Sequence, residues 1–212
     1  MLNHSSLRRC FTALACGIGA LLLAGAAGAD MKFISVKGAV TTEYSGKKSE
    51  VKAGSPLQFG DRIVGEAGSV AILQLPYEDV ALQGPFDMLL QANGEVKELA
   101  EIQLNFGKLR ARFKNLPANK KMKYRPVKTP VAVMGVRGTD FFASYEPGLG
   151  ETETICFEHE IDFGSTTRPF PSTRVKAGQW GGLGGRFGDK IRKPMTLKPA
   201  FLEAVKAQFP LE

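Results

Sequence analysis

Short apolar runs recur along the chain, and they constrain its fold more than any other feature. Between residues 31 and 113 they return roughly every ten residues, with Gly, Pro and Asn in the intervals, a spacing typical of short strands joined by turns. Residues 92–95, Ala-Asn-Gly-Glu, carry a strong turn signal. The pattern predicts one all-β domain of short strands, built as a solenoid, a roll or a sandwich. No residue-exact repeat singles out the solenoid.

A short helix is expected near the end of the chain, over residues 199–209. Pro199 stands near its first turn, where a proline is tolerated. The apolar side chains of this segment form one stripe, made by Phe201, Leu202, Val205 and Phe209. A helix this short is marginal by itself, so we expect it to dock on the β body or on a partner, with docking on the β body as the default.

Residues 129–145 combine two apolar runs with a tight Gly-Val-Arg-Gly-Thr segment. Apolar residues occupy both faces of the first run, which is typical of a buried strand. Gly135 and Gly138 flank Arg137, and glycine permits the backbone geometry of a corner. Arg137 has two interpretations: it is solvated or paired with a carboxylate such as Asp140, or it projects from a rigid corner to bind a carboxylate, a phosphate or backbone carbonyls.

The run Thr-Pro-Val-Ala-Val-Met-Gly-Val-Arg-Gly-Thr-Asp-Phe at residues 129–141 resembles the signature of the FecR domain family, T-P-x-A-x-x-G-V-R-G-T-x-F. Residues 54–63 resemble its G-x-x-L-x-x-G-D-x-I element, and residues 68–73 and 106–110 resemble two of its strands. The resemblance covers roughly residues 32–180. It implies a non-enzymatic interaction or signalling module of the periplasm. FecR-type domains in regulators relay the state of an outer-membrane receptor to a membrane-bound regulator of a sigma factor.

This chain departs from those regulators. It shows no N-terminal cytoplasmic helical region, no convincing membrane span and no small receptor-interacting domain. A stand-alone periplasmic protein that binds another envelope protein fits the sequence better. We expect the partner to meet the exposed corner formed by Gly135, Val136, Arg137, Gly138 and Thr139, or to add a strand to an open sheet edge.

The first 29 residues have the form of a cleaved export signal. Arg8 and Arg9 precede an apolar core at residues 11–23, and Ala27-Gly28-Ala29 stands before Asp30 as a small-x-small cleavage site. The apolar core is too short for a confident membrane span. The predicted organisation is a signal peptide over 1–29, the FecR-like domain over 30–180, and a Gly-rich linker with the C-terminal helix over 181–212.

Cleavage would leave Cys156 as the single cysteine, which excludes an intrachain disulfide and leaves the role of this thiol open. Subtracting Arg8 and Arg9 from the 28 basic residues leaves 26 against 21 acidic ones, a net charge of +5. This balance is not diagnostic. Nucleic acid is not expected as a partner, because an exported chain without an aromatic stacking array lacks the usual recognition surface.

The densest basic cluster begins with a strand whose charged residues alternate with apolar ones. Its basic face consists of Lys108, Arg110, Arg112 and Lys114. A solvated strand face explains this pattern. Alternatively, the face attracts an anionic partner such as a lipid headgroup, a cell-wall polymer or an acidic protein surface. That alternative would make the chain a structural envelope protein.

The sequence shows little support for catalysis, a cofactor or a metal. It has no G-x-S-x-G, H-E-x-x-H or Cys-x-x-Cys pattern. Residues 152–163 alternate as one strand, which predicts His159 on its apolar face as a hydrogen-bonded core residue and Cys156 on the other face, too far for joint metal ligation. Glu158, Glu160 and Asp162 could attract calcium, but a solvated acidic face, or one paired with the basic strand, explains them better.

Overall fold

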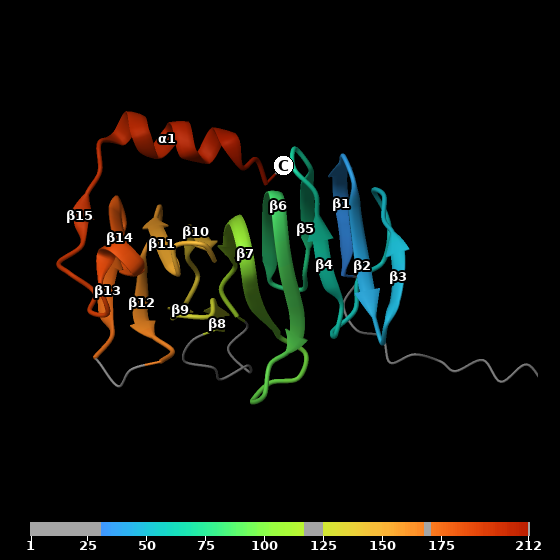
Figure 1. The fold of residues 1–212 in the computed structure, drawn as a ribbon, viewed down its shortest axis with the longest axis horizontal. Coiled ribbons are helices and arrows are strands. Elements are labelled where there is room, and N and C mark those ends of the chain that lie inside the picture. Colours follow the sequence, from blue (N-terminus) through green and yellow to red (C-terminus); the bar gives the residue numbers. More distant parts are fainter. Residues whose placement is uncertain (1–30, 117–124, 168–170, 212) are drawn as a thin grey trace, which may run out of the picture.

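A computed structural model of the chain describes residues 31–116, 125–167 and 171–211, so the predicted signal peptide lies outside the described residues. Most of these residues form strands, and one short α-helix, α1 (Pro199–Gln208), follows them. Figure 1 shows the strands standing side by side along the longest axis, with α1 lying across one flank. The prediction of an all-β domain with a C-terminal helix is confirmed.

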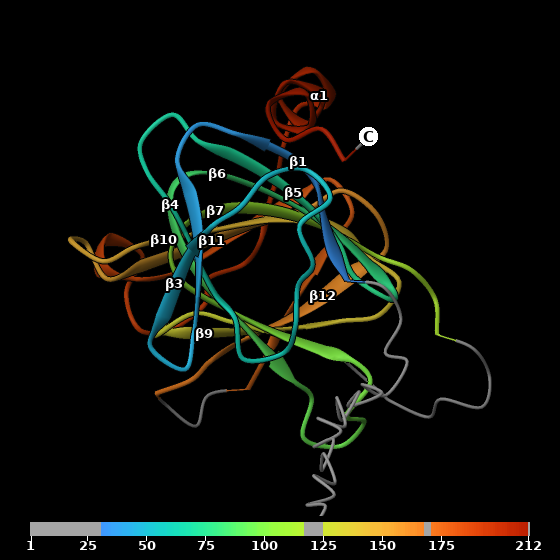
Figure 2. The same ribbon diagram turned by 90° about the vertical axis from the view of Figure 1, so that its right-hand side faces the viewer.

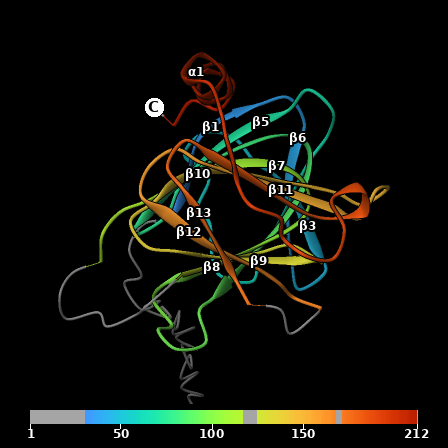
Figure 3. The same ribbon diagram turned by 90° about the vertical axis from the view of Figure 1, so that its left-hand side faces the viewer.

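The strands belong to one sheet that folds back on itself into a two-layered roll. The first layer contains, in order of pairing, β1 (Lys32–Lys37), β5 (Val70–Gln74), β6 (Glu78–Ala92), β7 (Ala100–Phe113), β10 (Asp140–Glu146), β11 (Glu151–Cys156), β14 (Gln179–Gly184) and β15 (Met195–Thr196). The second contains β3 (Lys47–Glu50), β2 (Val40–Tyr44), β4 (Arg62–Gly65), β6 and β7 again, β8 (Arg125–Lys128), β9 (Ala132–Val136), β12 (Glu160–Ser165) and β13 (Thr173–Lys176). In Figures 2 and 3, β5, β7 and β11 lie on the side of α1, and β9 lies on the opposite side of the interior.

The long strands β6 and β7 belong to both layers because each bends near its middle. Residues 79–83 of β6 pair with β5, whereas residues 86–89 pair with β4. Residues 107–112 of β7 pair with β10, whereas Ile102 and Gln103 pair with β8, in parallel. Gly107 lies at the bend of β7 with φ of 102°, and a Cβ there would stand 2.6 Å from the carbonyl oxygen of Pro85. A side chain at this position would therefore collide with β6.

The main core fills the space between the layers and extends from Phe33 to Leu183. Leu109, Ala111 and Phe113 point into it from β7, as their alternation with basic residues predicts. Phe141 and Ala143 do the same from β10. Strands that bury one face in this way gain stability mainly from the apolar area removed from water.

A second apolar cluster, here called the outer cluster, lies on the outer face of the first layer under α1. Its buried members from the sheet and the turn after β11 are Ile72, Ala81, Phe142, Ile155 and Phe157, and those from the chain after α1 are Phe209 and Leu211. Leu202 and Val205 of α1 pack against it. The helix therefore docks on the β body, as predicted. Phe201 of the predicted apolar stripe does not, since it is 52% exposed.

The prediction of one strand over residues 152–163 is wrong. Strand β11 ends at Cys156, and the chain turns before β12 begins at Glu160. His159 lies in this turn with φ of 62° and is exposed, so it is not a core histidine. The alternation of apolar residues continues across the turn, which conceals the break in the sequence.

The Gly-rich stretch is not a linker either, because residues 179–184 form β14 inside the sheet. Gly181 and Gly182 lie against large side chains: a Cβ would stand 3.1 Å from Val175 Cγ2 at the first and 2.8 Å from the Phe187 ring at the second. A short 3₁₀ helix, η1 (Gly185–Phe187), follows. In the part of the chain that the structure describes, no helix has the length and hydropathy required to cross a bilayer.

Candidate functional site

The segment Gly135–Thr139 forms a corner between the two layers, as the sequence predicts. It leaves the end of β9 in the second layer and enters β10 in the first layer. Gly138 has φ of 60°, a conformation that residues with a Cβ rarely adopt. The glycine therefore allows the chain to turn within three residues, from Arg137 to Thr139.

Thr139 holds this corner from inside the protein. Its side chain is fully buried, and its Oγ1 donates to the carbonyl oxygen of Glu160 at 3.1 Å. The amide of Arg137 lies 3.4 Å from the same hydroxyl. The amide of Phe113 donates to the carbonyl oxygen of Thr139 at 2.8 Å, which ties the corner to the end of β7. These contacts fix the backbone of the corner to β12 and to β7 and close the turn itself.

Thr129 opens the signature run and is a second buried anchor. Its Oγ1 accepts a hydrogen bond from the Ala132 amide at 3.0 Å, and it lies 2.6 Å from the Thr152 hydroxyl of β11. The amide of Thr129 donates in turn to the carbonyl oxygen of Ala132 at 2.8 Å. Both threonines of the signature thus have structural roles in this chain.

The Arg137 side chain, by contrast, is exposed. Among the residues with described positions, no carboxylate forms an ion pair with it. The interpretation that Asp140 pairs with Arg137 is wrong, because the Asp140 carboxylate points to two other arginines. A rigid backbone therefore presents a guanidinium whose five donors are available to a ligand.

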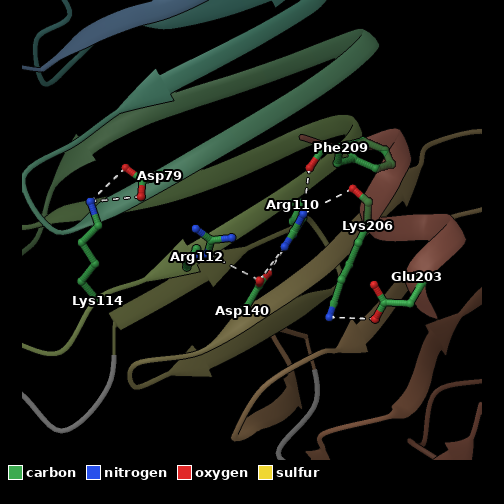
Figure 4. A network of polar contacts seen from close by, with 8 residues as sticks. All are labelled: Asp79, Arg110, Arg112, Lys114, Asp140, Glu203, Lys206 and Phe209. Atoms are coloured by element: carbon green, nitrogen blue, oxygen red, sulfur yellow. Dashed lines mark hydrogen bonds and ion pairs between the residues drawn. The ribbon is translucent and has the colours of Figure 1, made fainter. Parts of the chain in front are cut away.

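Asp140, directly after the corner, is buried and binds Arg110 of β7. Arg110 donates through Nε to Oδ1 at 2.9 Å and through Nη2 to Oδ2 at 2.7 Å, a bidentate pair. Arg112 Nε lies 3.6 Å from Oδ2. The remaining nitrogen of Arg110, Nη1, donates to the carbonyl oxygens of Phe209 at 3.1 Å and Lys206 at 3.3 Å (Figure 4). This network links the corner to the end of α1.

The basic face predicted from the alternation is only partly solvated. Arg110 is buried, so the prediction of one wet face is wrong at that position. Lys114 lies 3.0 Å from Asp79 (Figure 4), and Arg112 approaches Asp140, whereas Lys108 is exposed. The acidic residues of β12 do not pair with this strand: Glu160 and Asp162 face Arg174 of β13 instead. Internal pairing leaves less positive charge for an anionic partner than the sequence suggests.

Arg125, the first residue of β8, belongs to a buried pair with Glu78. Its Nη1 lies 2.6 Å from Glu78 Oε1, and its guanidinium stands 4.5 Å from the centroid of the Phe113 ring. Burial raises the pKa of the Glu78 carboxyl and lowers the pKa of Arg125, and each shift is opposed by the partner's charge. The local sequence does not mark this pair, because Glu78 stands beside a second acidic residue, Asp79, and Arg125 is 47 residues away.

An open groove of about 780 Å³ lies beside the end of β10, lined in part by Tyr145, Glu146, Glu151, Glu153 and Arg186. Arg186 binds both Glu151, at 3.1 Å, and Glu153, at 3.2 Å. These carboxylates therefore serve an ion pair. Across the described ranges, His, Cys, Asp and Glu nowhere form a cluster of three or more suited to a metal ion.

Cys156 is buried at the end of β11, and its Sγ donates to the carbonyl oxygen of Glu158 at 3.2 Å. Burial raises the pKa of this thiol to about 12. Since the thiolate is the reactive form of cysteine, the residue is chemically inert near neutral pH.

No family model and no curated protein matches the sequence. The fold is similar to two crystal structures, at 1.65 and 2.50 Å resolution, of a proposed anti-sigma factor from Parabacteroides distasonis ATCC 8503. Each has a TM-score of 0.55 and 13% sequence identity, over 68% of this chain. The match spans 63% and 62% of those two chains, a little under two thirds of their length. At this identity the similarity establishes a shared fold.

Proposed function

We propose that this chain is a non-enzymatic, FecR-like interaction module that acts in signal transduction at the cell envelope after export to the periplasm. The observation that carries the proposal is the corner at Gly135–Thr139, where the buried Thr139 fixes the backbone and Arg137 is presented to solvent. The fold shared with a proposed anti-sigma factor supports a regulatory role. The export signal in the first 29 residues supports the periplasm as its location.

The chemistry of the corner indicates what the partner presents. A guanidinium on a fixed backbone forms bidentate hydrogen bonds with a carboxylate, or several bonds with backbone carbonyls at the edge of a partner's sheet. Neither requires a reaction. The pairing of the groove carboxylates with Arg186 and the inert Cys156 thiol are consistent with a binding role.

Replacing Arg137 tests the proposal. The Arg137→Ala variant, expressed in the native host and crosslinked in intact cells, should recover much less of the partner protein than the wild type does. Its melting temperature should stay nearly unchanged, because the side chain is exposed. Arg192→Ala is a matched control, since Arg192 is also exposed and lies outside the corner. Unchanged crosslinking in Arg137→Ala would refute the role of the corner, and lost folding would make Arg137 structural.

A further inference from the structure

The outer cluster holds α1 by few contacts. No residue of the helix itself is buried, and Leu202 and Val205 are only half-buried. The firm anchors come after the helix, where Phe209 is 2% and Leu211 is 9% exposed. The rings of Phe142 and Phe209 lie 5.3 Å apart in an edge-on arrangement. The helix itself can leave the sheet at small cost, because its own side chains return little apolar area to water, whereas release of Phe209 and Leu211 also exposes buried side chains.

The polar part of this site recognises the end of a helix. Arg110 Nη1 donates to the carbonyl oxygens of Lys206 and Phe209, which lie in the last turn and at the C-cap (Figure 4). The last carbonyls of a helix lack the usual i+4 amide partner, and that end carries the negative pole of the helix dipole. The Lys206 carbonyl oxygen accepts from the Phe209 amide at 3.1 Å, and Arg110 adds a second donor to it. A guanidinium therefore satisfies groups that every helix C-terminus presents, whatever its side chains.

Asp140 limits which ligands Arg110 can bind. Its carboxylate takes Nε and Nη2 of Arg110, which leaves Nη1 directed at the helix. A phosphate or a free carboxylate is usually held by two nitrogens of a guanidinium, and Asp140 already occupies two of the three here. A peptide carbonyl needs only one donor. The geometry of the site therefore suits peptide carbonyls.

We propose that the outer cluster with Arg110 is a binding site for an amphipathic helix of a partner protein, and that α1 is its displaceable intramolecular occupant. The contacts of α1 define the ligand: apolar side chains at the spacing of Leu202, Val205 and Phe209, with the aromatic residue at the C-cap and the carbonyls of the last turn facing Arg110. The proposal makes no use of the Arg137 side chain, so it stands independently of the proposed function.

A partner is favoured over a second copy of this chain as the donor of that helix. Only two residues, Leu197 and Lys198, separate β15 from α1, and the Leu197 amide donates to the carbonyl oxygen of Gly178 at 2.9 Å. Leu197 also packs against the outer cluster. Exchange of α1 between copies would have to stretch or break this attachment. Binding of a partner's helix requires only that α1 leaves the outer cluster.

A labelled peptide of residues 195–211 serves as the probe, with fluorescence anisotropy on the full-length chain as the measurement. The Leu202→Asp variant weakens the docking of α1 and leaves the site intact, so it should bind the peptide about tenfold more tightly than the wild type does. Phe201→Asp is the matched control: this residue lies on the same helix but is exposed, so the affinity should equal that of the wild type. A peptide carrying Phe209→Ala should bind about tenfold more weakly.

Hydrogen exchange of the unmodified full-length chain gives an independent test. Amides of α1 should exchange roughly a hundredfold faster than those of β7 and β10 if the helix leaves the sheet without global unfolding. Equal protection would overturn the proposal, as would a Leu202→Asp variant that binds no peptide or one that binds the Phe209→Ala peptide equally well. Dimers at rising concentration with α1 exchanged between copies would overturn it in favour of a second copy.

Discussion

At the scale of single residues, the signature run divides into side chains that hold the backbone and one that does not. Thr129, Thr139 and Asp140 are buried and hydrogen-bonded, whereas Arg137 is exposed. A buried polar group is retained in a fold only when its hydrogen bonds are made, because an unmade one costs stability. Substitutions in this run should therefore separate into those that change stability and the one at Arg137 that changes binding.

Replacing Thr139 by Val tests whether the buried hydroxyl stabilises the fold. The substitution keeps the shape of the side chain and removes the hydroxyl, which leaves the Glu160 carbonyl oxygen and the Arg137 amide without their contact. We expect a loss of about 1–2 kcal/mol in the free energy of unfolding. Denaturant titration measures it. Thr139→Ser, which retains the hydroxyl, should lose less, and equal losses for both variants would contradict the role assigned to the hydrogen bonds.

Cys156 gives a prediction that depends on pH. Burial raises the pKa of the Cys156 thiol from the ordinary 9.0 to about 12, so at pH 8 the folded protein holds far less thiolate than the unfolded chain. Iodoacetamide should therefore label the peptide containing Cys156 only after denaturation, as read by mass spectrometry. Because the raised pKa belongs to the folded state, ionisation favours unfolding, and stability should fall as the pH rises from 9.0 toward 12. Rapid labelling of the native protein would contradict this.

At the scale of elements, the sequence predicts most strands, the corner and α1, because alternation, turn residues and an apolar stripe are local signals. It fails where tertiary contacts determine the local structure. The glycines of β14 indicate a linker, yet they are small because Val175 and Phe187 lie against them. His159 follows the alternation of a strand, yet it occupies a turn.

In the candidate site, too, local features are predictable from the sequence and long-range contacts are not. The corner and the exposure of Arg137 are predictable from its flanking glycines, since these permit a turn within a few residues. The burial of Arg110 and Arg125 is not, because their partners stand far away in the sequence. Asp140 is 30 residues from Arg110, and Phe209 is 99 residues from it. Spacing along the chain contains no signal for contacts of this range.

The bends of β6 and β7 are the elements that make a roll from one sheet, and Gly107 tests them. In a Gly107→Ala variant, the φ of 102° becomes strained and the new Cβ meets the Pro85 carbonyl oxygen and the Phe86 side chain. We expect a loss of about 2–4 kcal/mol in the free energy of unfolding, measured by denaturant titration. Gly94→Ala is the control, since a Cβ there has open space, and it should change stability by less than about 0.5 kcal/mol. Similar values for both variants would show that the bend tolerates a side chain.

At the scale of the whole molecule, a solenoid and the two-layered roll seen here differ in how cooperatively they are expected to unfold. In a solenoid of stacked repeats, each repeat contacts only its neighbours, and unfolding can begin at an end. Here β6 and β7 run through both layers, and one apolar core extends from Phe33 in β1 to Leu183 in β14. Neither layer can lose its central strands without exposing the interior face of the other.

We therefore expect the strands to unfold in a single transition. In differential scanning calorimetry, the calorimetric enthalpy should equal the van't Hoff enthalpy, as it does when no intermediate is populated. Far-UV circular dichroism, which reports the sheet, should give the same midpoint. Early loss of α1 would leave this result intact, because the helix lies outside the main core. Two transitions, one for β1 to β5 and one for β8 to β14, would show instead that the halves on either side of β6 and β7 fold separately, and that the shared strands connect them without coupling their stabilities.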